Sequence, residues 1–370
     1  MIVGLVKEIK NHEYRVGLTP NCVQEYTAAG HSVLFERGAG LGSGFPDEEY
    51  TAAGGKATDG AAAVWASADM IVKVKEPIAP EYKYLRDGLI LYAYLHLAAD
   101  KAQTDALLGA GVSAVAYETI TDAHGGLPCL APMSEIAGRM SVVEGAKYIE
   151  KTYGGRGVLL AGVPGVEKGN VMIIGGGTVG TEACKIAVGL GANVTILDIA
   201  ARRLAELDNL FGSRVQTLRS TPSNIRSGIV GADVVVGAVL LPGRKTPSLV
   251  KREDLALMKP GSVLVDVAVD QGGCFETTHP TTHREPTFIV DGIVHYCVAN
   301  MPGALARTST IALTNTTLQF GLEIAGKGLE TAIREDAHLR DGVNTYRGRC
   351  TCAGVSDAFG LACDDPLSLI

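Results

Sequence analysis

The sequence contains no hydrophobic run long enough to cross a membrane and no concentrated block of basic residues. Its apolar segments, such as residues 234–241, are far shorter than the roughly 18 residues that suggest a membrane-spanning helix. Lysine and arginine are scattered along a chain whose formal net charge is -7, which disfavours a nucleic-acid surface or a membrane-surface patch. We therefore expect a small-molecule partner, with no nucleic acid and no membrane involved.

A signal peptide and a disulfide framework are also missing. The first residues, MIVGLVKEIKNH, lack the layout of a signal peptide and are typical of a first strand. The eight cysteines are dispersed, which favours a reducing compartment, and we expect a cytoplasmic protein. Cys350, Cys352 and Cys363 lack the spacing of a zinc knuckle, so chance packing is favoured over a metal cluster.

The 46 glycines recur between short Val- and Ile-rich runs and Ala-rich stretches, which is the pattern of alternating strands and helices. A length of 370 residues suits two to three domains. The first series predicts strands at 2–9, 32–36, 70–75, 89–95 and 114–116, and helices at 21–29, 47–53, 59–66 and 100–110. The second series predicts strands at 170–174, 193–198, 214–218, 233–238 and 262–267.

Two long helices are expected to connect these series. Ser134 can cap a helix that ends near Gly154, and another helix spans 306–325. The predicted architecture is α/β, with two doubly wound Rossmann-like domains of parallel sheets, linked by long helices, and an active-site cleft between them. The expected bounds are 1–128 plus 307–370 for a discontinuous catalytic domain and 129–306 for a nucleotide-binding domain.

The segment VMIIGGGTVG has the features of a dinucleotide-binding turn. A predicted strand runs into Gly175, Gly177 and Gly180 with G-x-G-x-x-G spacing, and a helix follows. The three glycines would permit the tight turn, the approach of backbone to a pyrophosphate, and close packing of helix against strand. Asp198 ends the next strand about 20 residues later, where a carboxylate binds the adenosine ribose. This combination predicts a dinucleotide site.

The residues near Asp198 bear on the choice between NAD and NADP. The carboxylate would repel the additional phosphate of NADP, whereas Arg202 and Arg203 follow closely and could accept it. We expect NAD as the cofactor. Val239 and Leu240 lie at a later strand end, where a position beside a cofactor ribose and a position in the core are about equally expected.

Four polar side chains lie at or beyond predicted strand ends in separate segments. Ligands of open parallel sheets gather beyond the carboxyl ends of the strands, so we expect these side chains to converge: Arg15, Lys75, His96 and Asp270. A guanidinium and an ammonium suit a carboxylate substrate, and histidine with aspartate suits proton transfer. Each residue taken singly has another interpretation. Arg15 could be a solvated loop arginine, and Lys75 an edge-strand lysine that alternates with Lys73. His96 could be a buried core histidine, and Asp270 the anchor of a glycine turn.

His279 and His283 are spaced four residues apart, as in helical zinc pairs. Pro280 disfavours a helix there, so the shared helical face is lost. We expect a loop over the cleft and no metal.

Eight ordered motifs resemble the NAD-dependent L-alanine dehydrogenase family, and together they cover essentially the whole chain. They are KEIKNHEYRVGLTP, KVKEP, YLHLA, PMSEIAGRMS, GGGTVG, DVAVDQGG, HPTTHREPTF and VANMPGA. The resemblance implies NAD-dependent oxidative deamination of L-alanine to pyruvate and ammonium, and the reverse reductive amination, by hydride transfer and imine hydrolysis. It also implies a homohexamer.

The resemblance further implies roles for individual residues. Arg15 and Lys75 would bind the substrate carboxylate and carbonyl, His96 would be the acid/base group, and Asp270 would assist the water or carbinolamine step. The positions expected to bind NAD are Ser134, Gly175, Gly177, Thr178, Val179, Gly180, Asp198, Arg203, Ser220, Val239, Leu240, Val267, Ala268, Asp270, His279, Val298, Asn300 and Met301.

Two positions depart from the family pattern. His279 stands where the family usually has an arginine near the cofactor phosphates, which predicts weaker or pH-dependent NAD binding. Lys327 stands where some members pair a histidine with the equivalent of Glu323 for magnesium, which again predicts no metal. The alternatives are the nucleotide-binding subunit of a proton-translocating transhydrogenase and a non-catalytic NAD-binding regulator. YLHLA and Lys75 favour the dehydrogenase.

Overall fold

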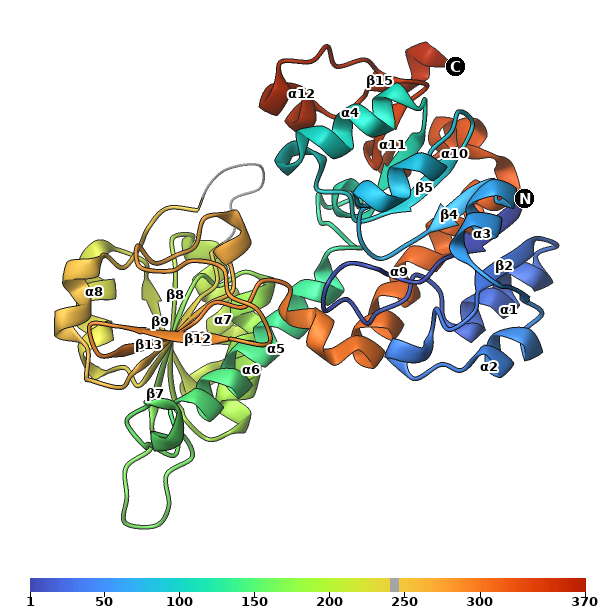
Figure 1. Ribbon diagram of the computed structural model, residues 1–370. Coiled ribbons are helices and arrows are strands. Elements are labelled where there is room, and N and C mark those ends of the chain that lie inside the picture. Colours follow the sequence, from blue (N-terminus) through green and yellow to red (C-terminus); the bar gives the residue numbers. More distant parts are fainter. Residues whose placement is uncertain (240–245) are drawn as a thin grey trace. The chain divides into compact units, whose positions relative to one another are not determined.

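The computed structural model describes residues 1–239 and 246–370, which form two compact units (Figure 1). Unit 1 comprises Met1–Met133 and Gly303–Ile370, and unit 2 comprises Ser134–Pro302. Each unit is built on a mainly parallel sheet flanked by helices, so the predicted α/β class is confirmed. In the described part of the chain, no helix has both the length and the apolar character needed to cross a membrane.

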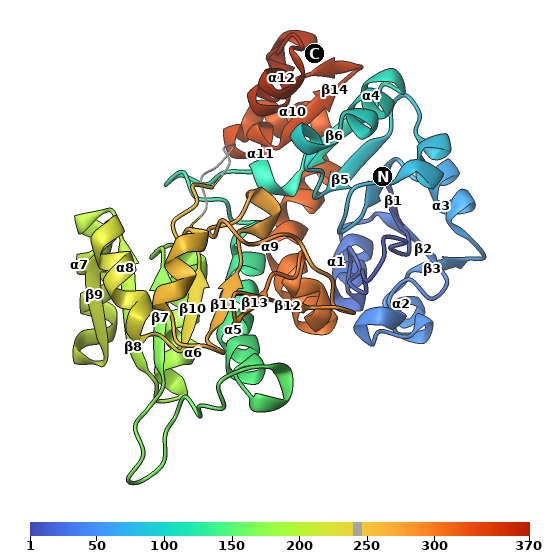
Figure 2. The same cartoon turned by 60° about the vertical axis from the view of Figure 1, so that its left-hand side comes forward.

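The sheet of unit 1 has the strand order β15-β14-β6-β5-β4-β1-β2-β3. The strands β1 to β6 are parallel wherever they pair with one another, whereas β14, beside β6 (Figure 2), pairs antiparallel with β6 and with the edge strand β15. The strands are β1 (Ile2–Leu5), β2 (Ser32–Glu36), β3 (Lys56–Thr58), β4 (Met70–Val72), β5 (Ile90–Ala93), β6 (Ser113–Ala116), β14 (Val343–Tyr346) and β15 (Arg349–Cys350).

Three helices of unit 1, α1, α4 and α11, begin at a residue whose side chain caps them. The Thr19 side chain accepts a hydrogen bond from Cys22 N ahead of α1, and Asp100 accepts one from Gln103 N ahead of α4. The helices are α1 (Pro20–Ala28), α2 (Asp47–Ala52), α3 (Ala61–Ser67), α4 (Lys101–Gly109), α9 (Ala306–Lys327), α10 (Leu329–Glu335), α11 (Ala337–Asp341) and α12 (Ala353–Phe359). A buried cluster that includes Trp65 and Leu91 supports this sheet.

The sheet of unit 2 has the strand order β12-β13-β11-β10-β7-β8-β9, with only β12 antiparallel to its neighbour. A buried cluster that includes Ile174 and Leu264 forms its core. The strands are β7 (Asn170–Ile174), β8 (Asn193–Asp198), β9 (Val215–Arg219), β10 (Val234–Gly237), β11 (Val263–Asp266), β12 (Thr287–Val290) and β13 (Ile293–Tyr296). The helices are α6 (Thr178–Gly189), α7 (Ala201–Phe211) and α8 (Pro222–Gly231), together with most of α5 (Ala131–Tyr148).

Several predicted bounds are wrong. The predicted strands 2–9, 70–75 and 89–95 stop at Leu5, Val72 and Ala93, so the site residues that follow lie in loops beyond them. The helix predicted over 134–154 runs from Ala131 to Tyr148, which places Ser134 inside the first turn and rules it out as the cap. The sheets are mainly rather than wholly parallel, because β12 pairs antiparallel with β13, and β14 pairs antiparallel with β6 and β15.

Candidate active site

Arg15 lies in the loop between β1 and α1 and is only 2% exposed, so it is not a solvated loop arginine. Its guanidinium is paired in two places with the Glu13 carboxylate: Nε lies 2.6 Å from Oε1 and Nη2 lies 2.5 Å from Oε2. Burial alone would raise the pKa of the Glu13 carboxyl, but the Arg15 charge and hydrogen bonds outweigh it and the pKa is lowered. The pair therefore holds a charged guanidinium inside unit 1, as recognition of a carboxylate requires.

Lys75 follows β4 in the segment KVKEP, and the Glu8 carboxylate holds the backbone at this point. Glu8 Oε1 accepts hydrogen bonds from Val74 N at 2.6 Å and from Lys75 N at 3.3 Å. Burial, and then the neighbouring Arg15 charge, lower the pKa of the Lys75 ammonium. An amine with a lowered pKa donates a proton to a carbonyl or imine more readily than an ordinary lysine does.

Lys73 is completely buried beneath this loop, because β4 lies between β1 and β5 and is not an edge strand. Its Nζ lies 3.1 Å from Glu8 Oε2 and 2.9 Å from Glu81 Oε1. The edge-strand interpretation of Lys75, which rested on its alternation with Lys73, is therefore wrong. Inspection of the sequence missed Glu8, Glu13 and Lys73, although the charge-rich segments that contain them were a visible signal.

His96 lies three residues beyond β5, and its side chain is 45% exposed, so it is not a buried core histidine. Its Nδ1 lies 3.4 Å from Glu76 Oε2, and its ring is tilted against Tyr94 with 6.0 Å between centroids. Burial would raise the pKa of the Glu76 carboxyl, but His96, Lys75 and Lys10 outweigh it and hold that pKa well below its usual range. The imidazole thus combines solvent access with a carboxylate partner, as an acid/base group requires.

In unit 2, the turn after β7 has the geometry that its three glycines predict. A Cβ at Gly180 would lie 1.8 Å from Gly175 O, and Gly175 itself has a φ of 105° with Ala238 O 2.5 Å from the place of its Cβ. Gly177, by contrast, has no atom within 4 Å of the place that a Cβ would take, and it precedes the first residue of α6, Thr178. Packing therefore requires Gly175 and Gly180, whereas the space at Gly177 is open for a phosphate to approach the helix N-terminus.

Asp198 and Arg203 both hold this turn through the peptide groups of Gly176. Asp198 Oδ2 accepts a hydrogen bond from Gly176 N at 2.8 Å, and Arg203 Nε donates to Gly176 O at 2.6 Å. The other nitrogens of Arg203 contact Thr181 Oγ1 and Glu206 Oε2. These contacts direct Arg203 towards the protein, and the half-buried Asp198 lies at the carboxyl end of β8, where a ribose would bind.

Asp270 is exposed in a short 3₁₀ turn (Val269–Gln271) that follows β11. The anchor of this loop is a different residue, Asp266, which is fully buried and accepts hydrogen bonds from Ala268 N, Cys274 N and Thr278 Oγ1 at 3.1, 2.8 and 2.7 Å. The interpretation of Asp270 as the anchor of the glycine turn is therefore wrong. Asp270 belongs to unit 2, whereas Arg15, Lys75 and His96 all belong to unit 1.

The remaining predicted cofactor residues lie on α5, on α6 and on segments after the strands of unit 2. Ser220 N donates to Asp198 O at 2.9 Å, and the exposed His279 stacks on Phe288 with 4.0 Å between ring centroids. Asn300 has a φ of 62°, and its carbonyl lies 3.2 Å from His283 Nε2. Leu240 lies outside the described residues. Partly buried or buried positions are Ser134, Val179, Val239, Val267, Ala268, Val298 and Met301.

The positions considered for metals carry other contacts. Lys327 Nζ lies 2.8 Å from Glu323 Oε1 and 2.7 Å from Glu335 Oε2. The Glu323 carboxylate, which a metal ion would need as a ligand, is therefore paired with an ammonium group. Across residues 1–239 and 246–370, no cluster of three or more His, Cys, Asp and Glu side chains could hold a metal ion.

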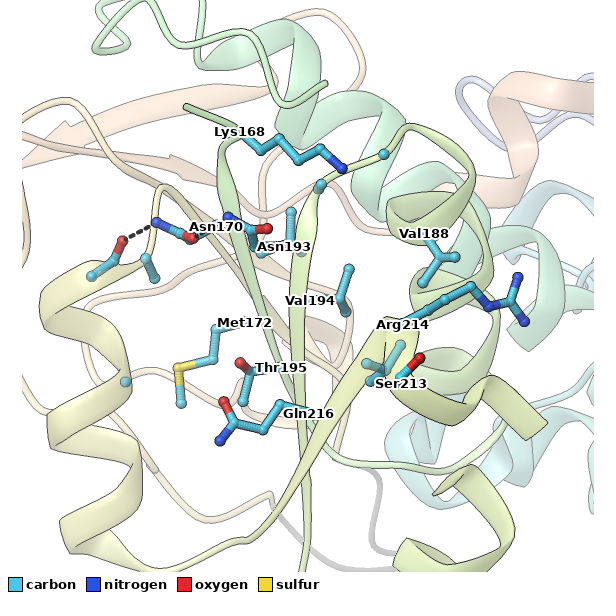
Figure 3. A pocket seen from close by; sticks show the side chains of 17 residues that line it. Lys168, Asn170, Met172, Val188, Asn193, Val194, Thr195, Ser213, Arg214 and Gln216 are labelled. Atoms are coloured by element: carbon cyan, nitrogen blue, oxygen red, sulfur yellow. Dashed lines mark hydrogen bonds between the residues drawn. The ribbon is translucent and has the colours of Figure 1, made fainter. Parts of the chain in front are cut away.

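A large hollow of about 850 Å³ lies in unit 2, away from the glycine turn (Figure 3). It is lined at the amino ends of β7, β8 and β9 by polar residues that include Asn170, Asn193, Arg214 and Gln216. Ligands of parallel sheets bind at the carboxyl ends of the strands, where Gly175 and Asp198 lie. Of the predicted site residues that the structure describes, none lines this hollow. It is therefore not the predicted cofactor site.

Comparisons with known proteins match both units. The N-terminal domain model of alanine dehydrogenase/PNT matches residues 4–137, and the C-terminal domain model matches 141–353. The alanine dehydrogenase of Halomonas elongata is 52% identical over 370 residues, which is 100% of both chains. A solved L-alanine dehydrogenase is similar with a TM-score of 0.95 and 50% identity, over 97% of this chain and 99% of that one. The solved transhydrogenase from Sinorhizobium meliloti is similar with a TM-score of 0.82 and 27% identity, over 95% of this chain and 99% of that one.

Proposed function

Because the chain belongs to the alanine dehydrogenase/PNT family, we propose that it converts L-alanine, NAD⁺ and water into pyruvate, ammonium, NADH and a proton, and also runs the reverse reaction. The observation that carries the proposal is the group of buried, charged side chains in unit 1 together with a dinucleotide turn in unit 2. The identity of about half to alanine dehydrogenases, against 27% to the transhydrogenase, favours this function over a transhydrogenase subunit.

Unit 1 has the groups that a small amino acid needs. Arg15 binds the substrate carboxylate, and Lys75, with its lowered pKa, contacts the carboxylate and the carbonyl. His96 takes up and releases the protons that water loses as it adds to the imine. Holding the substrate in one orientation supplies much of the rate, because the reacting atoms must align.

Unit 2 binds the nicotinamide cofactor, which when bound supplies the hydride acceptor. The open position at Gly177 and the N-terminus of α6 fit a pyrophosphate, and Asp198 fits an adenosine ribose. We assign NAD rather than NADP, because Asp198 is negatively charged and Arg203 is already engaged by Gly176 O and Thr181 Oγ1. Asp270 assists the water or carbinolamine step, and Ser134, Ser220, Val239, His279, Asn300 and Met301 contribute to cofactor binding.

The assembly is proposed to be a homo-oligomer, with the hexamer that the family resemblance implies. Light scattering of the purified protein tests this assignment. A mass of one chain would overturn it.

A substrate screen tests the reaction directly. The purified chain is incubated with each of several small amino acids and either NAD or NADP, and the absorbance of the reduced cofactor is recorded. We expect reduction of NAD with L-alanine and little reduction of NADP.

Binding of NAD without turnover of any amino acid would contradict the proposal. Calorimetry then separates the two alternatives. A regulator or a transhydrogenase subunit would bind NADH without forming a ternary complex with pyruvate.

A further inference from the structure

His96 has a backbone conformation that few residues other than glycine adopt. Its φ and ψ are 51° and 35°, in the left-handed region. Such a conformation persists only where the surrounding structure over-determines it, and it tends to occur at functional sites. Two carboxylates lie beside His96, one at its backbone and one at its ring.

A carboxylate from the turn after β6 holds the backbone of His96. β5 and β6 are parallel with Ala93 opposite Ala116, so two further residues bring Glu118 beside Leu95. Glu118 Oε1 accepts a hydrogen bond from His96 N at 2.6 Å, and both of its oxygens accept from Leu95 N at 3.1 and 3.2 Å. The carboxylate therefore fixes two consecutive peptide groups at the point where the chain turns.

A second carboxylate, from the loop that follows β4 on the other side of β5, faces the imidazole ring. β4 and β5 are parallel with Val72 opposite Tyr92, and the same offset brings Glu76 beside His96. Glu76 Oε2 lies 3.4 Å from His96 Nδ1, while its Oε1 is paired with the Lys10 ammonium. Glu76 is mostly buried, at 12% side-chain exposure, so its orientation is restricted.

We propose that Glu118 and Glu76 are positioning residues for His96, with Glu118 holding its backbone and Glu76 facing Nδ1, so that Nε2 is the atom that exchanges protons with substrate. The inference rests on the proposed function. A carboxylate beside Nδ1 favours the tautomer with its proton there, leaving the lone pair of Nε2 as the base.

The test compares Glu76→Gln, Glu118→Gln and His96→Ala, alone and combined, with Glu25→Gln as the matched control. Glu25 is an exposed glutamate on α1, far along the chain from these contacts. We expect Glu76→Gln and Glu118→Gln each to lower kcat for pyruvate reduction about 10- to 100-fold, as misplacement of a catalytic group does, with the KM for pyruvate changed less than about twofold. Glu25→Gln should leave kcat unchanged.

Combination with His96→Ala distinguishes positioning from a general structural role. Once His96 is absent, Glu76→Gln and Glu118→Gln should lower kcat by less than about twofold more, because groups that act through one residue are not additive. The inference would be overturned if the glutamate variants lowered kcat by the same factor with His96 present and with His96→Ala. A wild-type kcat in Glu76→Gln would also overturn it. If Glu118→Gln does not fold, Glu76→Gln decides the result, since it removes no backbone hydrogen-bond acceptor.

Failure of the proposed function has a separate signature. A wild-type chain that reduces no pyruvate, or a His96→Ala variant that retains full activity, overturns the assignment of His96 and this inference with it. Normal wild-type activity with an impaired His96→Ala variant leaves the proposed function standing, whatever the glutamate variants show.

Discussion

The two units hold their predicted ligand-binding residues by different physical means. In unit 1 charged side chains are buried together with their counter-charges: Arg15 with Glu13, and Lys73 with both Glu8 and Glu81. In unit 2 the binding turn consists mainly of backbone, shaped by the close approach of Gly180 to Gly175. The first arrangement depends on charge balance, and the second depends on the absence of a side chain.

The difference matches the ligands that the two units are proposed to bind. A small zwitterionic substrate offers few atoms, so its recognition requires charged groups that are already desolvated and oriented. A dinucleotide offers a pyrophosphate that backbone N–H groups can approach only where side chains are missing. Substitutions in unit 1 should therefore destabilise the protein by leaving a buried charge unpaired. Substitutions in the glycine turn of unit 2 should impair folding or cofactor binding through a steric clash.

The largest effect is expected from Gly180→Ala in unit 2. The new Cβ would lie 1.8 Å from Gly175 O, a backbone atom that cannot move without opening the turn. We expect loss of NADH binding and a destabilisation of more than about 4 kcal/mol, in the range of the most damaging single substitutions. Fluorescence titration with NADH and thermal unfolding measure the two effects.

Gly177→Ala is the matched control, because no atom lies within 4 Å of its Cβ position. It should fold with a nearly unchanged Tm yet bind NADH more weakly, because the methyl group would occupy the space for the phosphate. Equal behaviour of the two variants would contradict the distinction between a packing glycine and a binding glycine.

The second effect is expected from Lys73→Met in unit 1. This change leaves Glu8 and Glu81 buried without their counter-charge, which typically costs about 3–5 kcal/mol. Burial already raises the pKa of the Glu8 carboxyl, so protonation at low pH should relieve part of the deficit. Because the folded state then binds more protons than the unfolded one, the stability of Lys73→Met should rise as pH falls from neutrality.

Denaturant unfolding across this pH range tests the prediction, with Lys56→Met as the control. Lys56 is an exposed lysine on β3, and its replacement should change stability by no more than about 0.5 kcal/mol. A Lys73→Met variant that is as stable as the control would show that the buried charges are not interdependent.

The smallest effect is expected from Asp198→Ala, which removes the charged side chain that holds the glycine turn. Its two hydrogen bonds, to Gly176 N and Ala200 N at 2.8 Å each, are lost. The variant also loses the hydrogen bonds that Asp198 would accept from the adenosine ribose. Hydrogen bonds to a charged acceptor contribute about 1.5–3 kcal/mol, so NAD affinity should fall roughly 10- to 100-fold. Because Arg203 remains bound to Gly176 O, NADP should gain little.

Arg202→Ala serves as the comparison for this variant. Arg202 is 93% exposed and pairs only with Glu206 in the described contacts, so both cofactors should bind it as they bind the wild type. Strong NADP binding by Asp198→Ala would instead show that Arg203 can leave its contacts and accept the additional phosphate.

The sequence predicted the elements whose signals are local. β2, β7 and β8 were predicted residue for residue, because runs of β-branched residues end at glycines or at a charged residue. The strands β3, β12, β13, β14 and β15 were missed, because their short segments show no clear alternation. β14 in addition pairs with β6, which lies far earlier in the chain. The start of α5 was missed although Pro132, a common first-turn residue, marks it.

The site shows the same division. The position of His96 beyond a buried strand followed from periodicity and the strand-end rule, but its partners Glu76 and Glu118 did not. Those partners depend on the registers of β4 with β5 and of β5 with β6, which no local pattern specifies. Lys73 was misjudged for a similar reason, because its counter-charge Glu8 lies far earlier in the chain.

The antiparallel pairing of β14 with β6 has a consequence for synthesis of the chain. β6 ends at Ala116, whereas its neighbour β14 begins only at Val343, after every strand of unit 2 has left the ribosome. Unit 2 is continuous and can close its sheet first. Until β14 has been synthesised, β6 presents an unpaired edge, the kind of surface on which nascent chains aggregate. A chaperone would therefore protect this protein while residues 116 to 343 are being synthesised.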